Sequence, residues 1–337
     1  MEDLKQQNIP FSPSRGSGKG VRIVYMGTPD FAVEPLRILL DNGCNVVAVV
    51  TMPDKAIGRH HDQLQSSPVK KFAVERGLPV LQPGKLKDPA FLEELRSYQA
   101  DLQVVVAFRM LPEVVWDMPR LGTFNLHAAL LPQYRGAAPL NWAVINGDRE
   151  TGVTTFFLDH DIDTGRIIMQ ERCPIHETDN VGDVHDRLME LGSQLVLKTV
   201  RAIEEGTATS VPQEQFMTDE PLRHAPKIFK ETCRIDWHAG LRPVYNFVRG
   251  LSPYPAAWTQ LASGDGKAQD VKVYATHCEE AVHDQLPGTL RVDGSILSVA
   301  TPGGWLHIDE LQIAGKKRMA TADFLRGARI TEGMRFL

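Results

Sequence analysis

The sequence predicts an α/β protein with a doubly wound first domain and a smaller β-barrel domain toward its C-terminal end. Over residues 21–205, β-branched apolar runs alternate with segments of helical periodicity, which is the pattern of βαβ units. Beyond residue 230, short strand-like runs follow one another between turn residues, as in small barrels. The length of 337 residues leaves room for both domains.

The first domain, at 21–205, is expected to be Rossmann-like. Its runs at 45–51 and 102–108 are apolar on both faces, which is typical of parallel strands buried between helices. Strands are predicted at 21–26, 45–51, 78–81, 102–108, 123–127, 153–158 and 166–173. Helices are predicted at 31–41, 67–76, 89–98, 114–118, 139–146 and 183–203.

The remaining segments flank this domain. Residues 1–20 are polar and rich in Gly, Ser and Pro, and we interpret them as a flexible leader. Residues 206–230 contain scattered prolines and little periodicity, which indicates a linker. The C-terminal domain, at 231–337, is predicted to be OB-like. It is expected to hold a helix at 241–251 and short strands at 258–261, 271–276, 288–292, 296–300 and 305–311.

Composition narrows the classes of protein. Apolar residues make up 42% of the chain and charged residues 23%, as in ordinary globular proteins, and the net charge of -5 argues against a protein coated in basic residues. No run approaches the roughly 18 apolar residues of a membrane helix. The four cysteines are widely spaced and form no CxxC motif. We therefore expect free thiols, a cytoplasmic location and no metal site.

The segment TFNLHAALLPQYRGAAP at 123–139 carries the most chemistry. Asn125 and His127 alternate along one predicted strand, so both side chains point to the same face. They lie where a buried strand ends, and α/β sheets bind ligands at such ends. An Asn-x-His pair is nevertheless more often an ordinary hydrogen-bonded strand end than a site, so its significance depends on a second feature.

The second feature is the segment DHDIDTG at 159–165, which links two predicted strands. An amide, an imidazole and a carboxylate together suit acyl transfer to an amine, because they can stabilise an oxyanion and move a proton. An Asp-rich segment of this kind is usually only a turn. A calcium site formed by Asp159, Asp161 and Asp163 is conceivable, but the segment lacks the length and the terminal Glu of a calcium-binding loop. GxSxG and GxGxxG motifs are absent.

Several short motifs occur in a fixed order. They are MGTPDFA at 26–32, SSPVK at 66–70, NLHAALLPQYRGAAP at 125–139, DIDTG at 161–165, RIDW at 234–237 with Pro253-Tyr254-Pro255 behind it, and AGKKRM at 314–319. With them the chain resembles the methionyl-tRNA formyltransferase family over nearly everything from Val21 to the C-terminus. Single motifs are shared with other formyl-tetrahydrofolate enzymes, whereas the ordered set is specific.

The resemblance implies a reaction and its machinery. It implies transfer of a formyl group from 10-formyltetrahydrofolate to the methionine of initiator methionyl-tRNA, for translation initiation. It assigns catalysis to Asn125, His127 and Asp163, which match the Asn and His of the signature and the Asp before Thr-Gly. The implied partners are this tRNA and the folate, bound by a monomer without a membrane or a metal.

The resemblance also implies a folate-binding loop. Its backbone is formed by Ala129, Leu130, Leu131 and Pro132. The chain departs from the family twice near this loop. Ala129 stands where many members have Ser, and Phe108-Arg109-Met110 stands where an aromatic-Gly pair and one more residue are frequent. We expect Arg109 to change the wall of the folate pocket.

Cationic residues are candidates for tRNA contact. The loop at 52–67 is long, and in the family such a loop enters the acceptor stem; Arg59 matches a family Arg, and Lys55 lies nearby. The alternative is a solvated surface loop. Lys316, Lys317 and Arg318 could also bind phosphates, although a run of three cations is usually a solvated turn.

Other functions stay open at this point. A formyltransferase acting on a small amine, such as a nucleotide sugar or a purine precursor, needs the same site but no tRNA-binding domain. A hydrolase that releases formate from the folate uses water instead of an amine. A non-catalytic tRNA- or folate-binding module does not need the Asn, His and Asp set. A dinucleotide oxidoreductase fits the fold class but lacks its glycine fingerprint.

Overall fold

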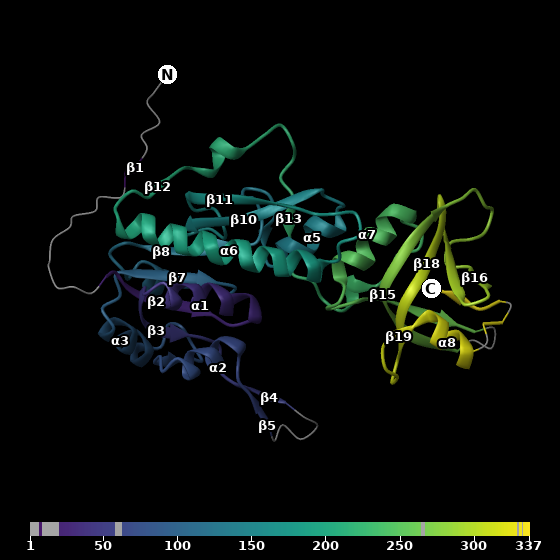
Figure 1. Ribbon diagram of the computed structural model, residues 1–337, viewed down its shortest axis with the longest axis horizontal. Coiled ribbons are helices and arrows are strands. Elements are labelled where there is room, and N and C mark those ends of the chain that lie inside the picture. Colours follow the sequence, from purple (N-terminus) through teal and green to yellow (C-terminus); the bar gives the residue numbers. More distant parts are fainter. Residues whose placement is uncertain (1–6, 9–19, 58–62, 264–266, 329, 332) are drawn as a thin grey trace. The chain divides into compact units, whose positions relative to one another are not determined.

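The computed structural model describes the chain except for residues 1–6, 9–19, 58–62, 264–266, 329 and 332 (Figure 1). Most of the predicted leader therefore lies outside the described residues. The chain divides into two compact units that are not contiguous in sequence. The first unit comprises residues 1–136, 151–173 and 186–224, and the second comprises 137–150, 174–185 and 225–337.

The first unit is built on a seven-stranded sheet with the order β11-β10-β8-β7-β2-β3-β6. Its strands are β2 (Arg22–Gly27), β3 (Asn45–Val50), β6 (Val80–Leu81), β7 (Leu102–Val106), β8 (Thr123–His127), β10 (Glu150–Phe157) and β11 (Ile167–Pro174). The strands from β6 to β8 in this order are parallel. The predicted Rossmann-like α/β fold is confirmed, with the addition that β10 runs antiparallel to β8.

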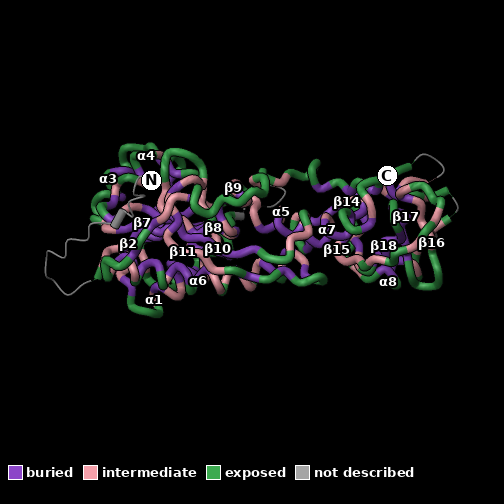
Figure 2. The backbone as a smooth tube through the Cα atoms, turned by 90° about the horizontal axis from the view of Figure 1, so that it is seen from above, coloured by how far each residue is buried: buried purple, intermediate pink, exposed green. Residues whose placement is uncertain are grey.

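Helices cover both faces of this sheet. Figure 2 shows α3 and α4 on one side of the strands and α1 and α6 on the other. The helices are α1 (Val33–Asp41), α2 (Pro68–Glu75), α3 (Pro89–Ser97), α4 (Glu113–Trp116) and α6 (Val181–Glu204), with a short 3-10 turn η1 (Asp30–Ala32) before α1. Ser67 is the N-cap of α2 and Asp88 is the N-cap of α3. Each side chain accepts a hydrogen bond from a backbone amide of the first turn, which fixes where the helix starts. Phe91 of α3 belongs to the same buried apolar cluster as Met26 of β2 and Val50 of β3.

Two segments differ from their sequence predictions. Within the predicted loop at 52–67, two described stretches pair as antiparallel strands, β4 (Lys55–Ile57) and β5 (Gln63–Gln65). The predicted linker at 206–230 contains β12 (Thr209–Ser210), the 3-10 helix η2 (Gln213–Phe216) and β13 (His224–Ala225). β12 pairs with β1 (Gln7–Asn8), and β13 pairs with β9 (Arg135–Gly136). Strands of two or three residues are too short to produce a periodic pattern.

The second unit contains a curled antiparallel sheet with the order β16-β17-β18-β15-β14-β20. Its strands are β14 (Ala257–Ala262), β15 (Ala268–Glu280), β16 (Leu290–Asp293), β17 (Ile296–Thr301), β18 (Gly304–Ile313), β19 (Met319–Ala320) and β20 (Arg335–Phe336). Its helices are α5 (Pro139–Ile145), the 3-10 helix η3 (Glu231–Cys233), α7 (Leu241–Leu251) and α8 (Thr321–Gly327). The predicted OB-like β domain is confirmed in this curled sheet, and α8 was not predicted.

The helices of the second unit approach each other closely at Gly250. A Cβ atom added to Gly250 on α7 would lie 2.5 Å from the Cγ1 atom of Ile145 and 2.9 Å from its backbone nitrogen on α5. Only glycine permits this approach. The side-chain amide of Asn141 also donates to the carbonyl of Gly250 over 2.9 Å. These contacts fix α5 against α7.

Candidate active site

His127 ends strand β8, and its imidazole is buried. Its Nε2 atom lies 2.8 Å from the carbonyl oxygen of Tyr134. Because a carbonyl oxygen only accepts hydrogen bonds, this contact places a proton on Nε2. The ring also meets Phe156 edge to face, with 6.4 Å between the ring centroids. Nδ1 is therefore the nitrogen that is left to exchange a proton.

Asn125 lies two residues earlier on β8, and its side chain is partly exposed. Among the residues that the structure describes, none forms a hydrogen bond with this side-chain amide. Polar groups inside proteins are usually paired. An amide that a central strand holds in place without a protein partner can donate its hydrogen bonds to a ligand.

Asp163 lies in the turn after β10 and adopts the left-handed conformation, with φ of 55°. Asp tolerates this conformation better than most residues. Its Oδ2 atom accepts a hydrogen bond of 3.0 Å from the backbone amide of Gly136 and lies 3.9 Å from Nδ1 of His127. A separation of 3.9 Å is too long for a direct hydrogen bond. The carboxylate and the imidazole thus face each other beside the strand that carries Asn125.

Two residues that the sequence analysis did not select position this turn. The side-chain amide of Gln213 donates to the carbonyls of Asp163 and Gly165 over 2.8 Å each, and its oxygen accepts from the guanidinium of Arg135. Gln213 is 1% exposed although it lies in the predicted linker. Gly165 is required because an added Cβ would lie 1.7 Å from the carbonyl oxygen of Phe157.

The backbone of the predicted folate loop at 129–132 is held by hydrogen bonds from two side chains, Thr154 and Gln170. The hydroxyl of Thr154 donates to the carbonyl of Ala129 over 2.7 Å and accepts from the amide of Leu131 over 3.2 Å. The amide of Gln170 donates to the carbonyl of Leu131 over 2.8 Å and to the Thr154 hydroxyl over 2.9 Å. These contacts fix the backbone of the loop before any ligand arrives.

The two departures from the family have structural consequences. Ala129 is fully buried, so its methyl group does not reach the surface of the site. Arg109 donates to the backbone carbonyls of Pro83 and Gly84, and burial lowers the pKa of its guanidinium. Arg109 therefore ties the turn after β7 to the loop after β6. Its effect on the wall of the folate pocket stays a prediction.

The base of the β4–β5 hairpin is anchored to the sheet. Asp54 accepts from Nζ of Lys70 over 2.6 Å and from the side-chain amide of Gln82 over 2.9 Å. The Lys70 ammonium and this amide hold the pKa of the Asp54 carboxyl below its ordinary value. The SSPVK motif thus supplies Lys70 as an anchor for the chain that enters the hairpin.

The predicted tRNA contacts lie on both units. Lys55 is exposed at the start of β4, whereas Arg59 lies outside the described residues. Lys316, Lys317 and Arg318 are exposed in the turn between β18 and β19. Arg318 is the least available of the three, because its guanidinium pairs with Glu310 and lies 4.2 Å from the ring centroid of Tyr274.

Within the ranges that the structure describes, no group of three or more His, Cys, Asp or Glu side chains has a geometry that could hold a metal ion. No helix in the same ranges has the length and apolar character to cross a membrane.

Comparison with known proteins agrees with this geometry. Residues 21–200 match the model of the formyl transferase family, and residues 227–329 match that of the formyl transferase C-terminal domain. The chain is 60% identical over 316 residues to a methionyl-tRNA formyltransferase of Bacteroides fragilis, covering 94% of this chain and 97% of that protein. It is 62% identical over 309 residues to the corresponding protein of Parabacteroides distasonis, covering 91% and 95%.

Solved structures share the fold at low sequence identity. A sugar 3N-formyl transferase, WlaRD, solved in the presence of dTDP and 5-N-formyl-THF, has a TM-score of 0.62 and 18% identity. The match covers 89% of this chain and 100% of that one. HypX from Aquifex aeolicus has the same TM-score and identity over 93% of this chain and 49% of its own.

Proposed function

The chain belongs to the family of methionyl-tRNA formyltransferases, and from this we propose that it transfers the formyl group of 10-formyltetrahydrofolate to the α-amine of methionine on initiator methionyl-tRNA. One observation carries the proposal. In a chain that matches this family over nearly its whole length, the buried imidazole of His127 faces the carboxylate of Asp163 at 3.9 Å, next to the side-chain amide of Asn125, which forms no hydrogen bond with any described residue.

The first step is attack of the neutral α-amine on the formyl carbon. The carbonyl oxygen becomes an oxyanion as the new carbon–nitrogen bond forms. Asn125 donates a hydrogen bond to this oxygen from its side-chain amide. His127 donates a second one from Nδ1 when the ring is protonated, because its Nε2 proton is already directed at Tyr134. Both donors are in place before the charge develops, so little reorganisation is needed.

The second step moves a proton from the amine to the leaving nitrogen. The attacking amine becomes acidic as its bond forms, and the carboxylate of Asp163 accepts its proton directly or through one water. The bond between the formyl carbon and N10 of the folate then breaks, and N10 takes a proton from His127. Transfer between Asp163 and His127 restores both groups. The products are the formylated amine and tetrahydrofolate, with no net change in protons.

The remaining residues bind the two substrates. The loop from Ala129 to Pro132 borders the folate, and the paired backbone groups of Ala129 and Leu131 keep it rigid. Lys55, Lys316 and Lys317 are exposed cations that can contact tRNA phosphates. We expect tRNA affinity to fall steeply with salt for this reason.

The test is a formylation assay with purified protein, 10-formyltetrahydrofolate and charged initiator methionyl-tRNA, with product formyl-methionine as the readout. Free methionine and uncharged tRNA are the controls. Formylation of the charged tRNA alone is the expected result. Folate consumption without formylation of that tRNA would overturn the proposed acceptor.

A small-amine acceptor is the main alternative, since a sugar formyltransferase shares the fold. A nucleotide amino sugar offered in the same assay separates the two functions. Formylation of the sugar in preference to methionyl-tRNA would favour the alternative. The second unit and the β4–β5 hairpin favour the tRNA.

A further inference from the structure

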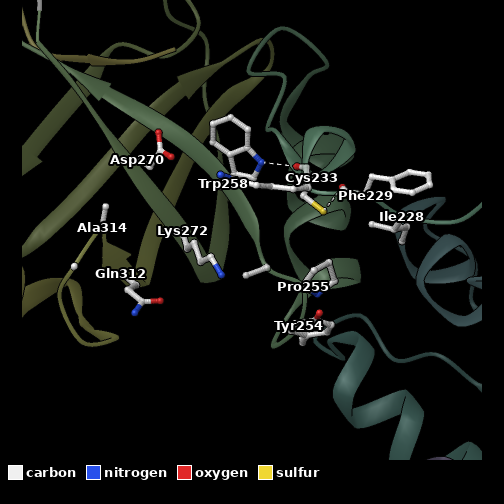
Figure 3. Close-up of a pocket in the computed structure, with 13 residues that line it drawn as sticks. Ile228, Phe229, Cys233, Tyr254, Pro255, Trp258, Asp270, Lys272, Gln312 and Ala314 are labelled. Atoms are coloured by element: carbon white, nitrogen blue, oxygen red, sulfur yellow. Dashed lines mark hydrogen bonds between the residues drawn. The ribbon is translucent and has the colours of Figure 1, made fainter. Parts of the chain in front are cut away.

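The second unit contains a pocket of about 510 Å³ on the outer side of its curled sheet (Figure 3). This volume lies within the range of roughly 300–1,000 Å³ that is usual for small-ligand sites. The wall is formed by the segment around η3, the turn before β14, and strands β14, β15 and β18. Its lining includes the aromatic and polar residues Phe229, Lys230, Tyr254, Trp258, Lys272 and Gln312.

Aromatic rings dominate the apolar part of this pocket. Phe229 is 54% exposed and Tyr254 is 82% exposed, which is unusual for rings of this size. Trp258 is partly exposed, and its Nε1 atom donates to the carbonyl of Lys230 over 2.7 Å, which fixes the indole against the wall. Figure 3 shows this hydrogen bond at the edge of the indole. A fixed indole is a platform on which another flat ring can stack.

Polar side chains continue the same surface across the sheet. Trp258 on β14 lies opposite Lys272 on β15, and Lys272 lies opposite Gln312 on β18. The residues on either side of Lys272 along β15, Val271 and Val273, are fully buried in the core. The outer face of three adjacent strands therefore presents an indole, an ammonium and an amide in one row, because side chains alternate along strands.

Four cationic side chains around this pocket have no carboxylate partner among the described residues. Lys227, Lys230, Arg234 and Lys272 form no ion pair with any carboxylate in the described part of the chain. Lys230 and Arg234 lie 5.7 Å from the ring centroid of Trp258, and Lys227 lies 5.3 Å from that of Phe229. By contrast, Arg318 in the turn between β18 and β19 pairs with Glu310. Unpaired cations beside exposed rings are typical of single-stranded nucleic-acid sites.

We propose that this pocket binds one unstacked nucleotide of the tRNA, with its base against Trp258 and a neighbouring phosphate on Lys272. The inference rests on the proposed function, because it takes tRNA as the substrate. The pocket lies wholly within the second unit, so it acts in binding and not in the chemical step.

Asp270 sets the orientation of the bound nucleotide. It lines the pocket and lies two residues before Lys272 on the same face of β15. Its Oδ1 atom accepts from Gln260 over 2.9 Å, which leaves Oδ2 as an acceptor. A carboxylate repels phosphate and attracts amino groups. The base edge therefore points toward Asp270, and bases with an exocyclic amino group are favoured over uracil.

The experiment measures formylation kinetics with tRNA as the varied substrate, for the wild type, Trp258→Ala, Trp258→Phe and Lys272→Gln. Loss of one stacked base is worth about 1–3 kcal/mol, so Trp258→Ala should raise the KM for tRNA by roughly 5- to 150-fold. Trp258→Phe should recover most of this loss, because it restores a ring. Lys272→Gln should reduce the salt slope of tRNA binding by about 0.7. The kcat at saturating tRNA should stay within about twofold for all three variants.

Controls separate a local effect from unfolding. Lys272 is exposed, so its substitution does not disturb the core, and Lys87→Gln on the first unit removes an exposed cation that does not line the pocket. GMP and UMP are added to the wild type, and quenching of tryptophan fluorescence is measured, with ribose 5-phosphate as the baseless control. Quenching by GMP that exceeds that by UMP, and that is lost in Trp258→Phe, is expected.

The experiments distinguish failure of the pocket inference from failure of the proposed function. If the wild type formylates methionyl-tRNA but Trp258→Ala and Lys272→Gln leave the KM for tRNA unchanged, the pocket does not bind tRNA. If GMP quenches fluorescence in that case, the pocket holds a free nucleotide instead, which also overturns the inference. If the wild type formylates no tRNA at all, the proposed function fails, and with it the assignment of the pocket to tRNA.

Discussion

Oδ2 of Asp163 lies 3.9 Å from Nδ1 of His127, while Nε2 of His127 is held 2.8 Å from the carbonyl of Tyr134. The contact with Tyr134 fixes a proton on Nε2 of the ring. A second proton can therefore enter or leave only at Nδ1, the nitrogen that faces Asp163. The amide of Gly136 holds the carboxylate in place through a 3.0 Å hydrogen bond. The pair is therefore arranged for proton transfer, and the two groups are set by different segments of the chain.

Asp163→Asn should keep this arrangement and remove its chemistry. An Asn at this position still accepts from Gly136 through its oxygen, so the turn should stay folded. Loss of the carboxylate should lower kcat on the order of 100- to 10,000-fold, which is the usual contribution of a general base. Asp161→Asn is the matched control, because Asp161 is exposed in the same turn. Equal kcat values for the two variants would contradict the role of Asp163.

Asn125→Ala should remove one donor to the oxyanion. The expected loss of kcat is on the order of 100- to 1000-fold, with thermal stability nearly unchanged, because the amide has no hydrogen-bond partner among the described residues. Asn125→Asp keeps the shape but supplies an acceptor, and it should be at least as inactive. Turnover of the Ala variant within about tenfold of the wild type would rule out this role.

The strands of the first unit could be predicted because a run that is apolar on both faces indicates a strand buried on both faces. The run at 102–108 is apolar on both faces, and β7 is buried throughout between two helical layers. The same reasoning placed Asn125 and His127 at a strand end. The division of the chain at 205 and 230 stays a prediction.

The parts that the sequence did not reveal depend on contacts between distant segments. Gln213 looks like any polar residue in a proline-containing stretch, and only the fold brings its amide to Asp163, 50 positions earlier. The hairpin at β4 and β5 has three-residue strands, and the antiparallel direction of β10 leaves no trace in its apolar run. Local periodicity reports burial, whereas pairing partners are set by tertiary structure.

Thr154→Val should loosen the loop at 129–132, which we propose borders the folate. The substitution preserves shape but leaves the carbonyl of Ala129, the amide of Leu131 and the amide of Gln170 without their common partner. The expected cost is about 1–3 kcal/mol in the free energy of unfolding, together with a higher KM for the folate. Denaturant unfolding and initial rates measure the two effects.

The neighbouring residue provides the control for this prediction. Thr155 is equally buried, but its hydroxyl pairs with that of Thr199, away from the loop. Thr155→Val should therefore lower stability without changing the KM for the folate. A similar change of KM in both variants would show that stability alone controls folate binding.

The second unit should lose stability in mild acid because of His307. Its ring stacks on His277 with 4.5 Å between centroids. Burial, and then repulsion by His277, hold the pKa of His307 below its ordinary value of 6.5, although Glu279 at 3.0 Å opposes the shift. The polar groups that face the ring are His277, Glu279, Arg291 and Ser298.

The direction of this change in stability with pH follows from proton uptake by His307. Below an unfolded pKa near 6.5, the unfolded chain binds this proton more readily than the folded one. The contribution to stability is thus complete above that pH and is lost as pH falls through the lower folded pKa. Melting temperature should drop between about pH 7 and pH 5, and His277→Gln should reduce the drop by removing the repulsion. His238→Gln, at an exposed site, should leave it unchanged.

Gln213→Ala should displace the turn that carries Asp163, the proposed proton acceptor, although Gln213 itself is not proposed to contact a substrate. The variant leaves the carbonyls of Asp163 and Gly165 unpaired and frees the guanidinium of Arg135. A displacement of the reacting groups by about 1 Å costs on the order of 100-fold in rate, so kcat should fall by roughly 10- to 100-fold. The KM for tRNA should stay near that of the wild type, because the exposed cations are unaffected. Gln215→Ala is the matched control, since Gln215 is exposed on the same 3-10 helix. A fall in thermal stability with unchanged kcat would make Gln213 a purely structural residue, whereas a selective loss of kcat identifies it as the residue that positions Asp163.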